Sequence, residues 1–137
     1  MRDGADPPAV LVTLPPVTVA GVADVRRRVS EAAHEVGLSP ERVAAFTVAV
    51  NEIVINAVEH GGGTAAVTLI LRTHRVVVEV VDHGTAPWRF SVPATPPPPG
   101  QLHGRGLWLA AKLSDELTVD AGGIDRLVRL TATTAGH

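Results

Sequence analysis

Two side chains near the middle of the chain have the types and the spacing to act together in chemistry. Glu52 and Asn56 are four residues apart in the stretch Phe46 to Gly63, which is otherwise apolar almost all round. On a helix they share one face, one turn apart, and His60 continues the row. A carboxylate can accept a proton from a hydroxyl group, and a carboxamide oxygen can bind a hydrated cation. The alternative is a fully paired polar network inside the core.

A second candidate is Asp82, which ends a run rich in β-branched residues and is followed closely by Gly84. A carboxylate at a strand end can accept the exocyclic amino proton of adenine. A glycine next to it lets the backbone approach a flat ring, because no Cβ stands in the way. These two residues therefore suit the base end of a nucleotide site.

A third candidate is the turn Gly104-Arg105-Gly106, which is expected to open a helix at Leu107. A glycine-rich turn that runs into a helix N-terminus offers free N–H groups and a positive dipole end to phosphates. Arg105 could contact a phosphate, or it could simply face solvent. Each of the three signals is weak alone, but their order along the chain indicates nucleotide binding.

The elements that must position these residues follow from periodicity, prolines and glycines. We expect strands over 9–14, 64–72, 75–82, 116–119 and 124–130, helices over 22–36, 40–60 and 107–113, and a long loop over 83–103. The valine-rich run from Val76 to Val81 has little room for a polar face, so it should be a central, covered strand. The order predicts an α+β two-layer sandwich with helices on one face of a mixed, mostly antiparallel sheet.

Composition bounds the class of protein. A chain of 137 residues is expected to form one domain, and the lack of cysteine excludes disulfides and thiolate metal sites. The net charge of −2 supplies no broad basic field for nucleic acid. No apolar run reaches membrane-spanning length, and no signal-peptide core is visible, so we expect a cytoplasmic protein. Residues 1–8 should be disordered, 9–130 should form the domain with a lid at 83–103, and 131–137 should be a flexible tail.

The three motifs, in this order, resemble the N box, first glycine box and second glycine box of the GHKL ATPase superfamily, shared by gyrase, histidine kinases and MutL. Asn51-Glu52-Ile53-Val54-Ile55-Asn56 and Gly104-Arg105-Gly106-Leu107-Trp108-Leu109 are most similar to the small anti-sigma-factor serine kinases of the RsbW and SpoIIAB type. The resemblance covers roughly residues 9–130 and implies the Bergerat ATP-binding fold.

The resemblance also implies a function and a set of roles. It implies an ATP- and Mg²⁺-dependent protein serine/threonine kinase that phosphorylates an anti-anti-sigma protein of the STAS type, sequesters a sigma factor and can form a homodimer. The implied roles are the catalytic base for Glu52, the Mg²⁺ ligand for Asn56, the adenine-amino contact for Asp82 with Gly84 as its spacer, and the phosphate loop for Gly104, Arg105, Gly106 and Leu107.

Two departures from the family pattern keep a second function open. The fifth position of the first glycine box is Ala86 instead of glycine, and Gly123 is followed by Ile124-Asp125 where the family usually has a Gly-Thr pair. The alternative is a catalytically weak or inactive ATP-binding module that regulates a partner by sequestration. A histidine-kinase catalytic domain is disfavoured, because we see no room for a dimerising helical hairpin with a phosphoacceptor histidine.

Overall fold

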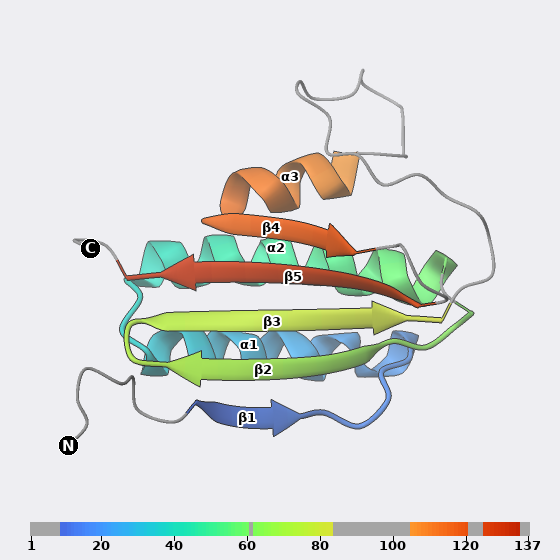
Figure 1. Ribbon diagram of the computed structural model, residues 1–137, viewed down its shortest axis with the longest axis horizontal. Coiled ribbons are helices and arrows are strands. Elements are labelled where there is room, and N and C mark those ends of the chain that lie inside the picture. The colour runs from blue at the N-terminus through green and yellow to red at the C-terminus, as the bar shows by residue number, and fades with distance from the viewer. Residues whose placement is uncertain (1–8, 61, 84–104, 121–124, 135–137) are drawn as a thin grey trace.

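The computed structural model describes residues 9–60, 62–83, 105–120 and 125–134. They form a five-stranded sheet, three α-helices and one short 3-10 turn (Figure 1). In chain order the elements are β1 (Val10–Thr13), η1 (Val19–Gly21), α1 (Val22–Glu35), α2 (Pro40–His60), β2 (Ala66–Arg72), β3 (Arg75–Asp82), α3 (Arg105–Leu113), β4 (Glu116–Asp120) and β5 (Arg126–Thr133).

The sheet has the order β1-β2-β3-β5-β4, so the valine-rich strand β3 is central, as predicted. All four pairings between these strands are antiparallel. The α+β fold class is confirmed, and the described strands contain no parallel pair, so the sheet is antiparallel and not mixed. The connections explain this: β2 and β3 form a hairpin through Thr73-His74, and β4 and β5 are also neighbours in sequence.

One face of the sheet carries the core. Every second residue along β2, β3 and β5 is buried on this face, and α1 and α2 pack over it. Figure 1 shows these two helices lying behind the sheet, with α3 beside β4 at one edge. The largest fully buried side chains are almost all aliphatic: Phe46, Ile53, Leu69, Leu130, Val29, Val50, Val54, Val67, Val76, Val78 and Val80. Each such side chain contributes roughly 1.5–3 kcal/mol when it leaves water.

Helix α1 ends where the glycine signal predicted. Gly37 has a φ of 102°, the left-handed conformation that favours glycine. Its N–H donates to the carbonyl of His34 at 3.0 Å, and the N–H of Leu38 donates to the carbonyl of Ala33 at 3.2 Å. These two bonds form a Schellman motif, which satisfies carbonyls that the helix end leaves unpaired.

Helix α2 has the predicted start and stop. The hydroxyl of Ser39 accepts a hydrogen bond from the backbone N–H of Arg42 at 3.3 Å, as an N-cap does. At the other end Gly62 and Gly63 have φ angles of 89° and 94°, and the Gly63 N–H donates to the carbonyl of Val58 at 3.1 Å. The end of α2 is therefore fixed next to the polar residues that it carries.

Strand β5 is longer than predicted. It continues to Thr133, three residues past the expected end at Leu130, because Thr131 and Ala132 pair with β3 and are buried. Residues 131–133, expected in a flexible tail, therefore belong to the sheet. Of the expected lid at 83–103, only His83 lies within the described residues, and the expected disorder of 1–8 lies outside them.

The opposite face of the sheet is more polar. Glu79 of β3 and Arg129 of β5 are register partners there, and the guanidinium donates to the carboxylate from Nε at 2.8 Å and from Nη2 at 2.6 Å. Leu11 on the edge strand β1 is 65% exposed.

Within the described residues, no helix is both long enough and apolar enough to span a bilayer.

Candidate nucleotide-binding site

Helix α2 lies between α1 and α3 and contacts both. Its α1 side is marked by Thr47, whose hydroxyl lies 2.9 Å from that of Ser30 and donates to the carbonyl of Val43 at 2.7 Å. Its α3 side is marked by Arg42, whose guanidinium bonds the carboxylate of Asp115 just after α3. The two sides of the helix are therefore identified by contacts.

Glu52 and Asn56 lie on the α3 side of α2. Asn56 follows Thr47 by nine positions, which places it about 180° away around a helix with about 3.6 residues per turn. Both side chains are half-buried. Among the residues that the structure describes, neither has a hydrogen-bond or ion-pair partner. A fully paired core network, the alternative raised above, is thus not what the described residues form around them.

The candidate motifs lie towards the same end of the sheet. In Figure 1 the C-terminal ends of α2 and β3, the first turn of α3 and the start of β5 all lie on the right-hand side. Residues 105–107 form the first turn of α3, so the helix begins two residues before the expected Leu107. The N–H groups of a first helical turn have no partner within the helix, so they can donate to an anion.

Asp82 is not an isolated carboxylate. It is the last residue of β3 and the register partner of Arg126, the first residue of β5. Arg126 donates from Nε to Oδ1 of Asp82 at 2.9 Å, and Nη2 lies 2.8 Å from the same oxygen. The two side chains are only 6% and 5% exposed. This buried ion pair is formed by two residues that are 44 positions apart.

Arg126 is the residue of this region that the sequence reasoning missed. One signal was present: Arg126 is in phase with Val128, Leu130 and Ala132, the alternate positions of β5 that face the core. A charged residue at an inward position needs a partner of opposite charge, because burial of an unpaired charge costs several kcal/mol. Asp82, opposite it on β3, is that partner.

A second contact joins the same two strand ends at the surface. His83, one residue after β3, places Nδ1 2.6 Å from Oδ1 of Asp125, one residue before β5. Both side chains are exposed. The contact links Asp125 to the residue that directly follows Asp82.

Several predicted site residues lie outside what the structure describes. Gly84 and Gly104 are outside the described ranges, as are Ala86 and Ile124. For Arg105, Gly106 and Leu107 the structure gives the helix backbone alone. The described part of the site thus consists of Glu52, Asn56, Asp82 and Arg126 together with the start of α3.

The small number of possible metal ligands near Asn56 suits a metal ion that binds together with a nucleotide. No group of three or more His, Cys, Asp or Glu side chains that could hold a metal exists among the described residues. Mg²⁺ keeps several waters and commonly takes few ligands from a protein, with phosphate oxygens as the rest. One half-buried carboxamide on α2 fits that requirement.

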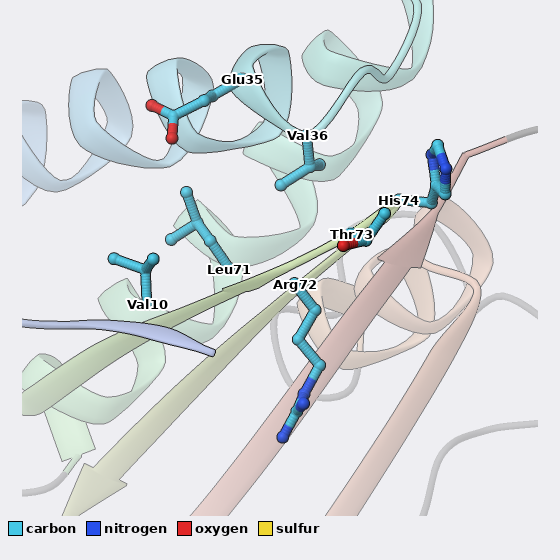
Figure 2. A pocket seen from close by; sticks show the side chains of 7 residues that line it. All are labelled: Val10, Glu35, Val36, Leu71, Arg72, Thr73 and His74. Atoms are coloured by element: carbon cyan, nitrogen blue, oxygen red, sulfur yellow. The ribbon is translucent and has the colours of Figure 1, made fainter. Parts of the chain in front are cut away.

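A hollow of about 390 Å³ lies at the other end of the sheet, by the β2–β3 hairpin. Its lining includes Val10, Leu71, Glu35 and His74. Figure 2 shows Val10 and Leu71 pointing towards α1, whereas Arg72 points to the opposite side of the sheet. The hollow is separated from Asp82 by the whole length of β3, so it is not part of the candidate site.

Comparisons with known proteins agree with the fold. The profile of the histidine kinase-like ATPase domain matches residues 16–132. Among curated proteins none matches significantly. The crystal structure of the RsbU and RsbW domains of Rv1364c from Mycobacterium tuberculosis is similar, with 26% identity and a TM-score of 0.64.

That alignment covers 93% of this chain and 32% of the Mycobacterium tuberculosis chain, so the chain spans about a third of the length of that relative. The match of the family profile includes every described element from α1 to β4 and nearly all of β5. The chain therefore belongs to the family of histidine kinase-like ATPase domains.

Proposed function

We propose that this chain is an anti-sigma factor and an ATP-dependent protein serine/threonine kinase of the RsbW type. Its protein substrate is an anti-anti-sigma protein of the STAS type, and its second partner is a sigma factor that it sequesters. ATP and Mg²⁺ are the proposed cofactors. The observation that carries the proposal is the pair Glu52 and Asn56, half-buried and without a partner among the described residues, on the side of α2 that faces α3.

Glu52 is the proposed general base. In phosphoryl transfer to a serine, the hydroxyl oxygen attacks the γ-phosphorus, the bond to the bridging oxygen breaks, and ADP leaves. The hydroxyl proton must go to an acceptor, and the Glu52 carboxylate is the acceptor that α2 offers. Sequestration alone requires no base, so the presence of Glu52 favours a kinase over a passive binding module.

Asn56 is the proposed Mg²⁺ ligand, one helical turn after Glu52. When bound with ATP, the metal neutralises charge on the phosphates during transfer. The side chain of Asn56 supplies one oxygen, and its place on α2 fixes where that oxygen lies relative to Glu52. The N–H groups of the first turn of α3 provide further positive potential for the phosphates.

The test is a pair of substitutions on α2, one of which should impair phosphoryl transfer alone and the other both ATP binding and transfer. Glu52→Gln keeps size and hydrogen bonding but removes the base, so ATP still binds while transfer falls by about a hundredfold or more. Asn56→Ala removes the ligand, so Mg²⁺-dependent ATP binding weakens as well. Calorimetry gives the affinities, and radiolabelled ATP with candidate antagonist proteins from the same genome gives the transfer rates.

Glu59→Gln is the matched control, because Glu59 is an exposed carboxylate on the same helix. It should leave affinity, transfer and melting temperature unchanged. If Glu52→Gln transfers phosphate at the original rate, Glu52 is not the base. If Glu52→Gln and Asn56→Ala only lower the melting temperature and leave ATP affinity unchanged, the pair is structural.

A binding module without kinase activity is the second candidate. The buried Asp82–Arg126 pair favours it, because the acidic residue proposed for adenine is already paired with a cation. Under this alternative the purified chain binds its sigma-factor partner with or without ATP. Transfer by the unmodified protein to any of the antagonists would exclude it.

A further inference from the structure

The two edges of the sheet differ in the charge that their strands carry. β4, at one edge, has an acidic residue at each end, Glu116 and Asp120. Charged side chains on an edge strand disfavour pairing with another chain. β1, at the other edge, has the sequence Val-Leu-Val-Thr and contains no charged residue. Its first two residues, Val10 and Leu11, are 57% and 65% exposed. β1 is therefore the edge at which a further strand can be added.

The outer side of β1 offers backbone groups for such pairing. The N–H of Leu14, just after the strand, donates to a carbonyl of β2 at 3.0 Å. Hydrogen-bonded positions alternate in an antiparallel pair, so Val10 and Val12 also bond to β2. The N–H and C=O groups of Leu11 and Thr13 therefore point away from β2. Among the described strands only β2 pairs with β1, so these groups can bond to another chain.

The hollow of about 390 Å³ by the β2–β3 hairpin adjoins the start of β1. Its apolar part is formed by Val10, Val36 and Leu71 (Figure 2). Its acidic residue is Glu35, in the last turn of α1, and Figure 2 shows the carboxylate on the α1 side of the hollow. Glu35 is exposed and has no hydrogen-bond or ion-pair partner among the described residues. The hollow therefore combines apolar side chains with an unpaired carboxylate.

The charges around the hollow favour a cation as its occupant. Arg72 also lines it, but Figure 2 shows this side chain pointing to the opposite side of the sheet. An arginine side chain from another protein suits what remains, because its stem is apolar and its head is a cation. The stem can cover Val10 and Leu71 while the guanidinium donates to Glu35.

We propose that β1 and the hollow form a docking site for an extended segment of a protein partner, which pairs antiparallel with β1 and places an arginine in the hollow. Residues opposite one another on neighbouring strands point to the same face. The partner residue opposite Val10 therefore points to the helix face, where the hollow lies. The next residue of the partner points to the other face and covers Leu11 if it is apolar.

The probe is the peptide acetyl-Val-Thr-Val-Arg-Val-amide, whose arginine lies opposite Val10 when the peptide runs antiparallel to β1. NMR titration of the full chain with this peptide gives the affinity and the residues that respond. The proposal expects the largest shifts at the edge of β1 and around the hollow, and none at Asn56 in the candidate nucleotide site.

Two changes remove the two halves of the charge contact. Glu35→Gln removes the carboxylate, and the fold should tolerate it because Glu35 is exposed. Norleucine in place of the arginine removes the cation from the peptide. Each change should weaken binding by about tenfold, the size expected for one hydrogen bond to a charged group. Combined, they should weaken it by about the same factor as either alone, because both remove the same contact.

The backbone pairing can be tested without a change in the protein. An N-methyl group on the valine before the arginine blocks the N–H that would bond to Leu11, so this peptide should not bind measurably. Glu116→Gln is the matched control, because it removes the same charge from the opposite edge strand and should leave the peptide affinity unchanged. Glu35→Gln should also leave Mg²⁺-ATP affinity unchanged, so the result does not depend on the proposed function.

The proposal is wrong if the full chain does not bind the peptide, if both charge changes leave the affinity as it was, or if the N-methylated peptide binds equally well. A second copy of the chain is the other possible occupant, since β1 carries no charge that would repel its own copy. Sedimentation of the unmodified chain and of Leu11→Lys distinguishes the two. A dimer that Leu11→Lys converts to a monomer, together with no peptide binding, would identify the second copy and reject the arginine segment.

Discussion

Two ion pairs join the same two strands, β3 and β5, from opposite faces of the sheet. Asp82–Arg126 faces the helices and its side chains are 5% and 6% exposed, whereas Glu79–Arg129 faces away from them with 25% and 47% exposure. Both pairs connect register partners. The difference between them is therefore burial, and burial decides whether a charge pair affects the stability of the fold.

The largest expected effect is the loss of one member of the buried pair. Asp82→Ala leaves the Arg126 guanidinium without its buried anion, and it should lower the free energy of unfolding by about 3–5 kcal/mol. Glu79→Ala, the matched change on the open face, should cost no more than about 1 kcal/mol. Urea unfolding of both variants measures the difference. Equal losses would show that burial is not what separates the two pairs.

Replacement of the whole buried pair sharpens the comparison. The double variant Asp82→Leu with Arg126→Met removes both charges and fills the space with apolar atoms of similar size. It should recover most of the stability lost in Asp82→Ala, because burial of two paired charges gains little over good apolar packing. The same unfolding experiment tests it. If the double variant is as unstable as Asp82→Ala, the pair itself stabilises the strand ends.

The coupling energies of the two pairs should also differ in their dependence on salt, and this effect is smaller. A double-mutant cycle on Glu79 and Arg129 should give a coupling energy below about 1 kcal/mol, which falls further as salt screens exposed charges. The corresponding cycle on Asp82 and Arg126 should be larger and nearly independent of salt, because little solvent reaches it. Coupling energies that respond equally to salt would contradict the buried position of Asp82.

The smallest effect is expected on α1, where all partners are exposed. Arg27 and Arg28 hydrogen-bond Asp24 at 2.6 Å and 3.0 Å, and they lower its pKa in the folded protein. A lowered folded-state pKa contributes stability that is present at neutral pH and is lost as pH falls through that pKa. Asp24→Asn should therefore be slightly less stable than the unmodified protein at pH 7, and the difference should vanish in acid. Melting curves across this range measure it, and a difference that grows in acid would contradict the sign.

The sequence predicted local features well. The helix starts and stops at Ser39, Gly37 and Gly62 follow from backbone preferences that each residue carries by itself. The central place of β3 follows from valines on both of its faces. These features need no knowledge of what lies opposite, which is why periodicity and glycines were sufficient.

Features that depend on register between distant segments were not predicted. The pairing of Asp82 with Arg126 requires the alignment of β3 and β5, and the extension of β5 to Thr133 requires the same alignment. A strand that shifts by one residue turns every side chain to the other face, so composition alone cannot fix such contacts. The roles of Glu52, Asn56 and the start of α3 stay predictions, since the structure shows their positions and not their ligands.

Because the start of α2 is bonded to Asp115, a mutation far from the candidate site can change the position of Asn56. Arg42 near its start is bonded to Asp115, whose carboxylate also accepts the Thr133 N–H at 2.6 Å, and Asn56 lies about 21 Å further along the helix. A rigid rod that tilts by about 3° at such an anchor moves its far end by about 1 Å. Since a misplacement of about 1 Å can cost a hundredfold in rate, mutations at Asp115 should lower the proposed kinase activity without changing any residue that binds a ligand.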